Sequence, residues 1–236
     1  MEAQKILIIT TSHETLGDTG EKTGVWLEEL AAPYYVFEDA GTLVTIASPK
    51  GGKVPFDPKS ELDDALTPAA MRFQQDEEAI NSITFSIPLE EVKEEDYDAV
   101  FLPGGHGPMW DLADNVVLKH LLEAFNNKHK PMGFVCHGVA GLVSVQNEEG
   151  DPLVKGIKLT SFSDSEEEVA GLADKVPFLL ESRLRSLGAN YHKGPDFTNY
   201  VVADENIITG QNPASSVDAA VEILTMIIPQ KASVTY

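Results

Sequence analysis

The single cysteine of the chain, Cys136, has the side chain and the setting for nucleophilic chemistry. It follows the apolar run Pro131–Val135 (PMGFV) and precedes the small-residue segment His137–Gly141 (HGVAG). A nucleophile at the tip of a strand that turns sharply into a helix needs small residues after it, because a large side chain would block the turn and the substrate. The N-terminus of such a helix would lower the pKa of the thiol. A lone cysteine is also often a small buried hydrophobe, so both interpretations stay open on these residues alone.

A glutamate near the N-terminus is a candidate proton shuttle. At helical spacing, one apolar stripe comprises Trp26, Leu30, Pro33, Tyr34 and Phe37. Glu29 lies on the flank of this stripe, whereas Glu28 points nearly the opposite way, toward solvent. A carboxyl held against an apolar face should have a raised pKa, although a boundary glutamate whose head reaches water is the alternative. Pro33 inside the pattern predicts a kink or a break in the helix.

Two further motifs follow predicted strands. Gly104 and Gly105 come directly after Asp98–Leu102, and their backbone N–H groups could bind a developing oxyanion. A Gly-Gly pair is equally typical of a plain turn. The acidic run Asp164–Glu168 follows the predicted strand Lys158–Ser161. It is either a solvated helix start or the source of a carboxylate that orients a histidine.

Short apolar runs alternate with helical patterns, which predicts an α/β fold with a mostly parallel sheet covered by helices on both faces. The predicted strands are Lys5–Thr10, Leu43–Ser48, Asp98–Leu102, Pro131–Val135, Lys158–Ser161 and a late pair, Tyr200–Ala203 and Asn206–Thr209. The predicted helices are Gly24–Ala40, Asn115–Asn127, Gly138–Val145, Val176–Leu187 and a last one that Asn212 and Pro213 open, ending near Ile228. Ligands of open α/β sheets bind at the carboxyl ends of strands, where Cys136 is expected.

The segment from about 49 to 96 interrupts this alternation, being rich in glycine, proline and charge. We expect a single domain over residues 1–236 with this segment as a small cap or lid outside the sheet, carrying one or two short helices. A long surface loop is the alternative. The last residues, QKASVTY, are expected to form a weakly ordered tail.

Composition excludes several classes of function. Thirty-eight acidic against seventeen basic residues leave a net charge of −21, which disfavours nucleic acid and anionic membrane surfaces as partners. One cysteine allows neither an intramolecular disulfide nor a cysteine zinc cluster. Neither a signal peptide nor a 20-residue apolar span is visible, so we expect a soluble, cytoplasmic protein. His13 and Glu14 lack metal-ligand spacing, and we expect no metal and no cofactor.

Several motifs together resemble one known family. The segments KILIITTS, GEKTGVWLEELAAPYYVFEDAG, DAVFLPGGHGPMWDL, GFVCHGVAGL, KGIKLTSFSDSEEEV and ITGQNPASS, in this order, are similar to the ThiJ/PfpI superfamily, and most to its heat-shock chaperone/glyoxalase III branch. The resemblance spans nearly the whole chain. It implies a flavodoxin-like three-layer sandwich, usually dimeric, so we expect a homodimer.

The resemblance also implies roles for individual residues. Cys136 is similar to the family nucleophile, His137 to its triad partner and Glu167 to the triad acid, with Glu166 and Glu168 as one-residue alternatives. Glu29 matches the carboxyl that hydrogen-bonds the cysteine sulfur. Gly105, with the backbone of His137, matches the oxyanion site.

The implied activity is conversion of a small dicarbonyl, methylglyoxal, to D-lactate without glutathione or cofactor. Cys136 would form a hemithioacetal, and Glu29 or His137 would move a proton through an enediol to give a thioester that water hydrolyses.

Other functions stay open: a cysteine hydrolase, a stress chaperone and a redox sensor. The Cys–His pair would also suit a hydrolase (peptidase, deglycase or amidase). A class I glutamine amidotransferase is disfavoured, because none of the six histidines is followed two positions later by glutamate. A stress chaperone that binds unfolded client proteins, or a redox sensor that oxidises Cys136, belongs to a different class.

Overall fold

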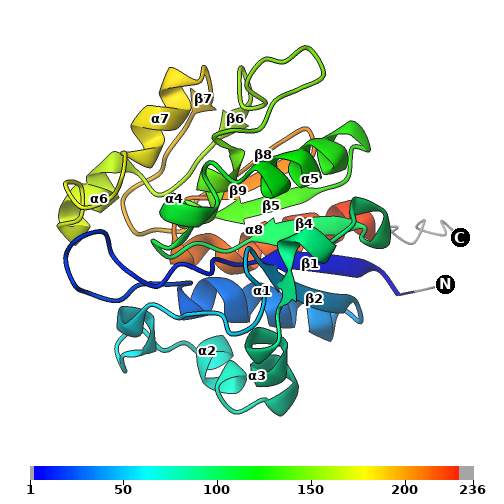
Figure 1. Ribbon diagram of the computed structural model, residues 1–236, viewed down its shortest axis with the longest axis vertical. Helices are drawn as coiled ribbons and strands as arrows, with labels where there is room; N and C mark the ends of the chain where they lie inside the picture. The colour runs from blue at the N-terminus through cyan, green and yellow to red at the C-terminus, as the bar shows by residue number, and fades with distance from the viewer. Residues whose placement is uncertain (1–2, 229–236) are drawn as a thin grey trace, which may run out of the picture.

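A seven-stranded sheet runs through the middle of the molecule (Figure 1), in a computed structural model that describes residues 3–228. Its strands, in spatial order, are β3 (Ile87–Pro88), β2 (Leu43–Ser48), β1 (Lys5–Ile9), β4 (Ala99–Leu102), β5 (Met132–Val135), β9 (Ile207–Gly210) and β8 (Val201–Asp204). All neighbours pair in parallel except β8, which is antiparallel to β9. The predicted α/β class with a mostly parallel sheet is therefore confirmed, as is the late strand pair.

Helices cover both faces of the sheet. The α-helices are α1 (Leu27–Asp39), α2 (Pro68–Phe73), α3 (Glu77–Thr84), α4 (Pro108–Asp111), α5 (Val116–Asn127), α6 (Asp164–Ala170), α7 (Leu180–Ser186) and α8 (Ser216–Ile227). α1 and α8 pack against each other on one face, and α5 packs on the other. Along β1, Ile6 and Ile8 belong to the core under α1 and α8, whereas Leu7 and Ile9 belong to the core under α5. Both faces of β1 are apolar because both are buried.

Some predicted elements differ in extent or type. α1 begins at Leu27, later than expected, and runs without a break past Pro33 to Asp39. The predicted helix Val176–Leu187 is the shorter α7. The strand expected at Lys158–Ser161 is β6 (Lys158–Leu159), which pairs only with β7 (Asn190–Tyr191) in a separate two-stranded sheet. The QKASVTY tail lies outside the described residues.

The expected helix Gly138–Val145 is instead a 3₁₀ helix, η4 (Cys136–Leu142), that starts on the cysteine itself. Its tight path brings the chain against the end of β4. A Cβ atom at Gly138 would lie 2.2 Å from the backbone oxygen of Leu102. Glycine is therefore required there, because no side chain fits between the two backbones.

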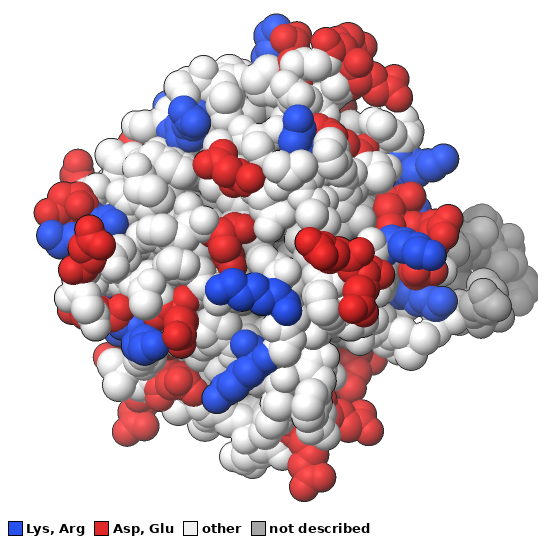
Figure 2. Space-filling model, viewed as in Figure 1, with Lys and Arg blue, Asp and Glu red and all other residues white. Residues whose placement is uncertain are grey.

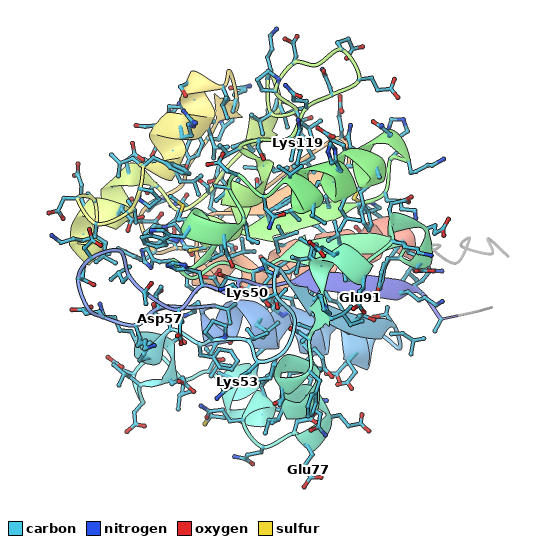
Figure 3. The ribbon with its side chains drawn as sticks, in the orientation of Figure 1. Lys50, Lys53, Asp57, Glu77, Glu91 and Lys119 are labelled. Atoms are coloured by element: carbon cyan, nitrogen blue, oxygen red, sulfur yellow. The ribbon has the colours of Figure 1, made fainter. Side chains whose placement is uncertain are left out.

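The segment 49–96 is not a long irregular loop, because it contains helices and one strand of the main sheet. Besides α2 and α3 it holds three 3₁₀ helices, η1 (Pro58–Glu61), η2 (Leu89–Glu91) and η3 (Glu94–Asp96), and its strand β3 extends the sheet edge. Figure 3 labels Lys53, Asp57 and Glu77 on it. Only Asp57 and Lys59 of this segment line the main cavity. Asp57 accepts a hydrogen bond from Thr23 Oγ1 at 2.9 Å, which ties the segment to the chain before α1.

Charge is spread over the molecule rather than gathered by sign. Figure 2 shows acidic and basic side chains interspersed on one face, with acidic ones more numerous. Within residues 3–228, no helix combines the length and apolar character needed to cross a bilayer.

Candidate active site

Cys136 lies where β5 ends, at the carboxyl edge of the sheet. Its backbone has φ +57°, a left-handed conformation that is uncommon outside glycine and that re-aims the side chain sharply after the strand. The residue is 3% exposed and lines a cavity of about 320 Å³. The strained backbone conformation thus places the thiol where the apolar core under α1 and α8 meets the cavity.

A hydrogen-bonded chain of side chains leads away from the sulfur. His137 Nδ1 lies 3.2 Å from Cys136 Sγ, and His137 Nε2 lies 2.7 Å from Glu167 Oε2. The other carboxylate oxygen of Glu167 lies 2.8 Å from His106 Nε2. β5 and η4 supply the cysteine and His137, whereas α6 supplies the carboxylate through the Ser163 capping box that starts this helix. Three segments far apart in sequence thus meet at one point.

The pKa values of Glu167 and His137 both lie below their ordinary values, for different reasons. Burial acts to raise its pKa, but His137 and the hydrogen bonds from the two histidines outweigh burial and hold the pKa well below its ordinary value. Burial lowers the pKa of His137, and His106 lowers it further. A neutral His137 that donates Nε2–H to the carboxylate leaves the Nδ1 lone pair facing the thiol.

Glu29, in the first turn of α1, is fully buried beside Cys136. Burial raises its pKa to about 8, although the Gly104 N–H, which donates to Oε2 at 2.8 Å, acts in the opposite direction. Its other oxygen, Oε1, is buried without a hydrogen-bond partner among the described residues. The carboxyl is therefore protonated at neutral pH and has one oxygen free to exchange a proton in the cavity, as the apolar stripe of α1 predicts.

The pKa of the Cys136 thiol differs from expectation. Burial and the neighbouring Glu29 raise the pKa of Cys136 well above its ordinary value, so the lowering expected from a helix N-terminus is wrong for this site. An ionised Glu29 would repel a thiolate, whereas the protonated form can donate to it. His137 Nδ1, 3.2 Å from the sulfur, is the neighbouring group placed to accept the thiol proton.

The two glycines after β4 have different surroundings. Gly104 donates its N–H to Glu29 Oε2 in this structure, so that N–H is engaged and not available to the oxyanion expected there. Gly105 lines the cavity with φ +80°, and a Cβ atom there would lie 2.3 Å from the backbone oxygen of Gly24. Only glycine can bring this backbone so close to the site.

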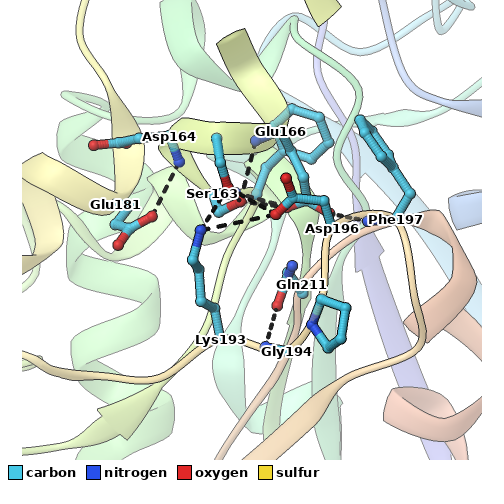
Figure 4. Close-up of polar contacts among 12 residues, drawn as sticks. Ser163, Asp164, Glu166, Glu181, Lys193, Gly194, Asp196, Phe197 and Gln211 are labelled. Carbon is cyan, nitrogen blue, oxygen red and sulfur yellow. Dashed lines mark hydrogen bonds and ion pairs between the residues drawn. The ribbon is translucent and has the colours of Figure 1, made fainter. Parts of the chain in front are cut away.

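The structure distinguishes the three consecutive glutamates of α6. Glu167 faces His137, whereas Glu168 is exposed. Glu166 is buried and accepts hydrogen bonds from the Ser163 and Phe197 backbones and from Asn212 Nδ2 (Figure 4). Glu28, expected in solvent, is half-buried against Thr67, whose hydroxyl donates to it.

Sequence reasoning missed His106. The available signal was its position directly after Gly104–Gly105 at the end of a buried strand, where the carboxyl ends of strands converge. Its hydrogen bond to Glu167 cannot be predicted from local sequence, because the two residues are 61 positions apart and meet only through the packing of α6.

Metal-ligating side chains do gather here. Ligand atoms of His106, His137 and Glu167 lie within 4.8 Å of one another, but each is already engaged in the hydrogen bonds described above. A metal ion would have to displace those bonds. His13 stacks on Trp110 with 5.0 Å between ring centroids, and Glu14 pairs with Lys22, so these two residues do not converge on a site.

Comparison with known proteins agrees with this architecture. The family model described as the DJ-1/PfpI family matches residues 22–226. The chain belongs to this family. Among DJ-1/PfpI relatives, "Glyoxalase 3" of Candida albicans is 30% identical over 234 residues, covering 93% of this chain and 96% of that protein. "Glutathione-independent glyoxalase HSP31" of Saccharomyces cerevisiae is 29% identical over 231 residues, covering 94% and 97%.

Solved structures give the same picture of the DJ-1/PfpI fold. Rapid encystment protein REP24 of Francisella tularensis superposes with a TM-score of 0.92 at 37% identity, covering 96% of this chain and 100% of that chain. Glyoxalase III of Candida albicans superposes with a TM-score of 0.87 at 28% identity, covering 94% and 96%. The flavodoxin-like fold expected from the motifs is thereby confirmed.

Proposed function

We propose that this DJ-1/PfpI protein is a glutathione-independent glyoxalase that converts methylglyoxal to D-lactate. The observation that carries the proposal is the pairing of a buried Glu29, whose pKa is raised to about 8, with the thiol of Cys136 in one cavity. This reaction needs a nucleophile and a group that both gives and takes a proton near pH 7. Two relatives that match nearly the whole chain carry glyoxalase names, which supports the same reaction.

The first step adds Cys136 to the aldehyde carbon. The sulfur forms a bond to this carbon, the carbonyl π bond breaks, and the thiol proton passes to His137 Nδ1, 3.2 Å away. Glu167 stabilises the resulting imidazolium through Nε2. Gly105 and His137 line the cavity next to the sulfur, and their backbone N–H groups are our proposed partners for the oxyanion. Protonation of this oxygen gives the hemithioacetal.

The second step moves a proton between the two carbons. A base removes the proton from the former aldehyde carbon, an enediol forms, and the neighbouring carbon is reprotonated. Of the two candidate groups, we favour Glu29, which enters protonated, gives its Oε1 proton to the oxyanion in the first step and so becomes the carboxylate that removes the carbon-bound proton and returns it to the neighbouring carbon. His137, which holds the former thiol proton at this stage, protonates the ketone oxygen as the enediol forms and takes a proton back from the other oxygen as the thioester forms. The product is a thioester, which water hydrolyses to lactate and free thiol. The sum is addition of one water, so no oxidant or cofactor is required.

The decisive experiment measures D-lactate formed from methylglyoxal in the absence of glutathione. We expect turnover by the wild type and a loss of about 10³-fold or more in Cys136→Ala and His137→Ala. His120→Ala is the matched control, since this exposed histidine pairs with Glu123 on its own helix and lies outside the cavity lining, and it should retain full activity. Undiminished turnover by Cys136→Ala would overturn the mechanism. A parallel assay with a glutamine donor tests the amidase alternative.

The homodimer stays a prediction from the family resemblance, the binding of unfolded clients stays an alternative function, and the cytoplasmic location stays a prediction from the sequence. Sedimentation velocity of the purified chain tests the first, and protection of an aggregating client by Cys136→Ala tests the second.

A further inference from the structure

The cavity beside Cys136 is much larger than methylglyoxal. Its volume is about 320 Å³. A molecule of five non-hydrogen atoms occupies roughly 100 Å³, since a water molecule takes about 30 Å³ in the liquid. Methylglyoxal bound at the sulfur would therefore leave most of the cavity unfilled, whereas cavities of this size suit larger ligands.

Apolar side chains make up most of the cavity lining. Phe162 packs against His137 with 4.6 Å between ring centroids, and Phe197 packs edge-on against Phe162 at 6.0 Å. Trp26, Leu16 and Leu172 add further apolar surface. The rings thus form a series from His137 through the buried Phe162 to the partly exposed Phe197, which places Phe197 where it can contact a substituent on a substrate held at Cys136.

The cavity offers little to a charged substituent. Its one basic side chain other than histidine is Lys59, which is 57% exposed and pairs with Glu21 at 3.5 Å. The carboxylate of Asp57 would repel an anion, and its two oxygens already accept hydrogen bonds from Thr23 Oγ1 and the Lys59 N–H. An uncharged apolar group is the substituent that these surroundings favour.

Phe197 is held in place by a costly local structure. It is 48% exposed yet has φ +56°, a conformation that bulky residues rarely adopt. Its N–H donates to the buried Glu166 Oε1 at 2.7 Å, and the preceding Asp196 accepts from Ser165 Oγ at 2.7 Å (Figure 4). The loop is thus fixed to α6, the helix that carries Glu167, and the ring is fixed relative to the reacting groups.

On these grounds, and resting on the proposed glyoxalase function, we propose that the preferred substrates are uncharged 2-oxoaldehydes with a larger apolar substituent, of butyl or phenyl size, and that Phe197 determines this specificity. The aldehyde end would lie at Cys136, and the substituent would cover the Phe162 and Phe197 rings. The reaction at the aldehyde and ketone carbons is the same as with methylglyoxal, so each substrate adds one water and gives the corresponding 2-hydroxy acid.

The test is a comparison of kcat/KM for methylglyoxal, 2-oxohexanal and phenylglyoxal, with Cys136→Ala to measure the uncatalysed background. The two alkyl compounds have similar aldehyde reactivity, so their ratio reports binding of the substituent. We expect kcat/KM for 2-oxohexanal to exceed that for methylglyoxal by about tenfold or more. In Phe197→Ala the ratio of kcat/KM for 2-oxohexanal to that for methylglyoxal should fall by about tenfold. The ratio for Phe197→Leu should lie between those of the wild type and Phe197→Ala.

Val169→Ala is the matched control, because Val169 is an apolar α6 residue, 69% exposed, outside the cavity lining. It should leave the ratio at the wild-type value, and thermal unfolding checks that all variants fold. Turnover of methylglyoxal at or above the rate for 2-oxohexanal would overturn this inference and leave the proposed function standing. Turnover of none of the three compounds would overturn the proposed function itself. An unchanged ratio in folded Phe197→Ala would remove Phe197 as the determinant.

Discussion

Glu29 is a carboxyl whose chemistry is decided by burial. Its pKa of about 8 lies above the ordinary 4.5, so between these values the folded state holds a proton that the unfolded chain has released. The free energy that this proton contributes to folding is fully present below pH 4.5 and is lost as pH rises to about 8, at roughly 1.4 kcal/mol per pH unit. Glu29→Gln removes the titration while keeping an acceptor for Gly104.

We therefore expect the stability of the wild type relative to Glu29→Gln to fall steadily from pH 5 to pH 8. Urea denaturation at each pH unit measures this difference. Glu168→Gln, which changes an exposed glutamate four positions into α6, should instead give a curve parallel to the wild type. Parallel curves for Glu29→Gln would mean that the carboxyl is ionised in the folded protein.

His106 is a second residue whose contribution can be measured separately. His106→Ala leaves Glu167 Oε1 without its histidine partner, which should cost about 1–3 kcal/mol because Glu167 is only 2% exposed. The pKa of His137 should rise at the same time, since His106 is one of the groups that lower it.

NMR titration of the His137 ring in both proteins measures this shift, and chemical denaturation measures the loss of stability. His106→Gln, which can still donate to Glu167, should recover part of the stability. An unmoved His137 pKa in His106→Ala would show that the two rings are electrostatically independent.

At the scale of elements, the turn from β5 into η4 depends on two glycines in different surroundings. A Cβ atom at Gly138 meets the backbone oxygen of Leu102 at 2.2 Å, whereas one at Gly141 meets the end of the Leu102 side chain at 2.8 Å. A side chain can move aside, but a backbone inside a sheet cannot without breaking its ladder.

Gly138→Ala should therefore destabilise the protein by several kcal/mol, at the high end of single substitutions, and Gly141→Ala by about 1–2 kcal/mol. Thermal and urea unfolding of the pair measure the difference. Equal losses would indicate that the β4 end moves to accommodate the methyl group, and that the strained elbow at Cys136 is less rigid than its contacts suggest.

The elements themselves were predicted well where burial produces a clear pattern. β1, β2, β4, β5 and α5 lie within a residue or so of their expected bounds, because continuous apolar runs and helical spacing are local signals. The α-helix expected over 138–145 is the 3₁₀ helix η4, because small residues carry little information about helix type. The helix expected over 176–187 is the shorter α7, because a short amphipathic stretch marks its ends poorly. Pro33 did not break α1, because packing of this helix against α8 and β2 outweighs one missing hydrogen bond.

For the whole molecule, the net charge of −21 predicts self-repulsion of the folded state. Added salt screens this repulsion, so Tm should rise by a few degrees between low ionic strength and about 0.5 M NaCl. Replacing Glu148 and Glu149, both exposed, with glutamine should raise Tm at low salt and reduce its response to salt. A Tm that falls with salt would mean that ion pairs outweigh the repulsion.

The sequence by itself determined the fold class, the position of Cys136 after a buried strand, and Glu29 on an apolar helix face, because each depends on neighbouring residues or on one helical period. Only the tertiary structure decided which of the three consecutive glutamates faces His137, and that His106 contacts the same carboxylate. It also decided that the Gly104 N–H donates to Glu29, and that the thiol is buried beside this protonated carboxyl. It also showed that the 49–96 segment contributes only Asp57 and Lys59 to the cavity, which Phe162 and Phe197 line as well. The physical reason is the same in each case. Hydrogen bonding and desolvation depend on segments that meet only after the sheet has brought the carboxyl ends of its strands together.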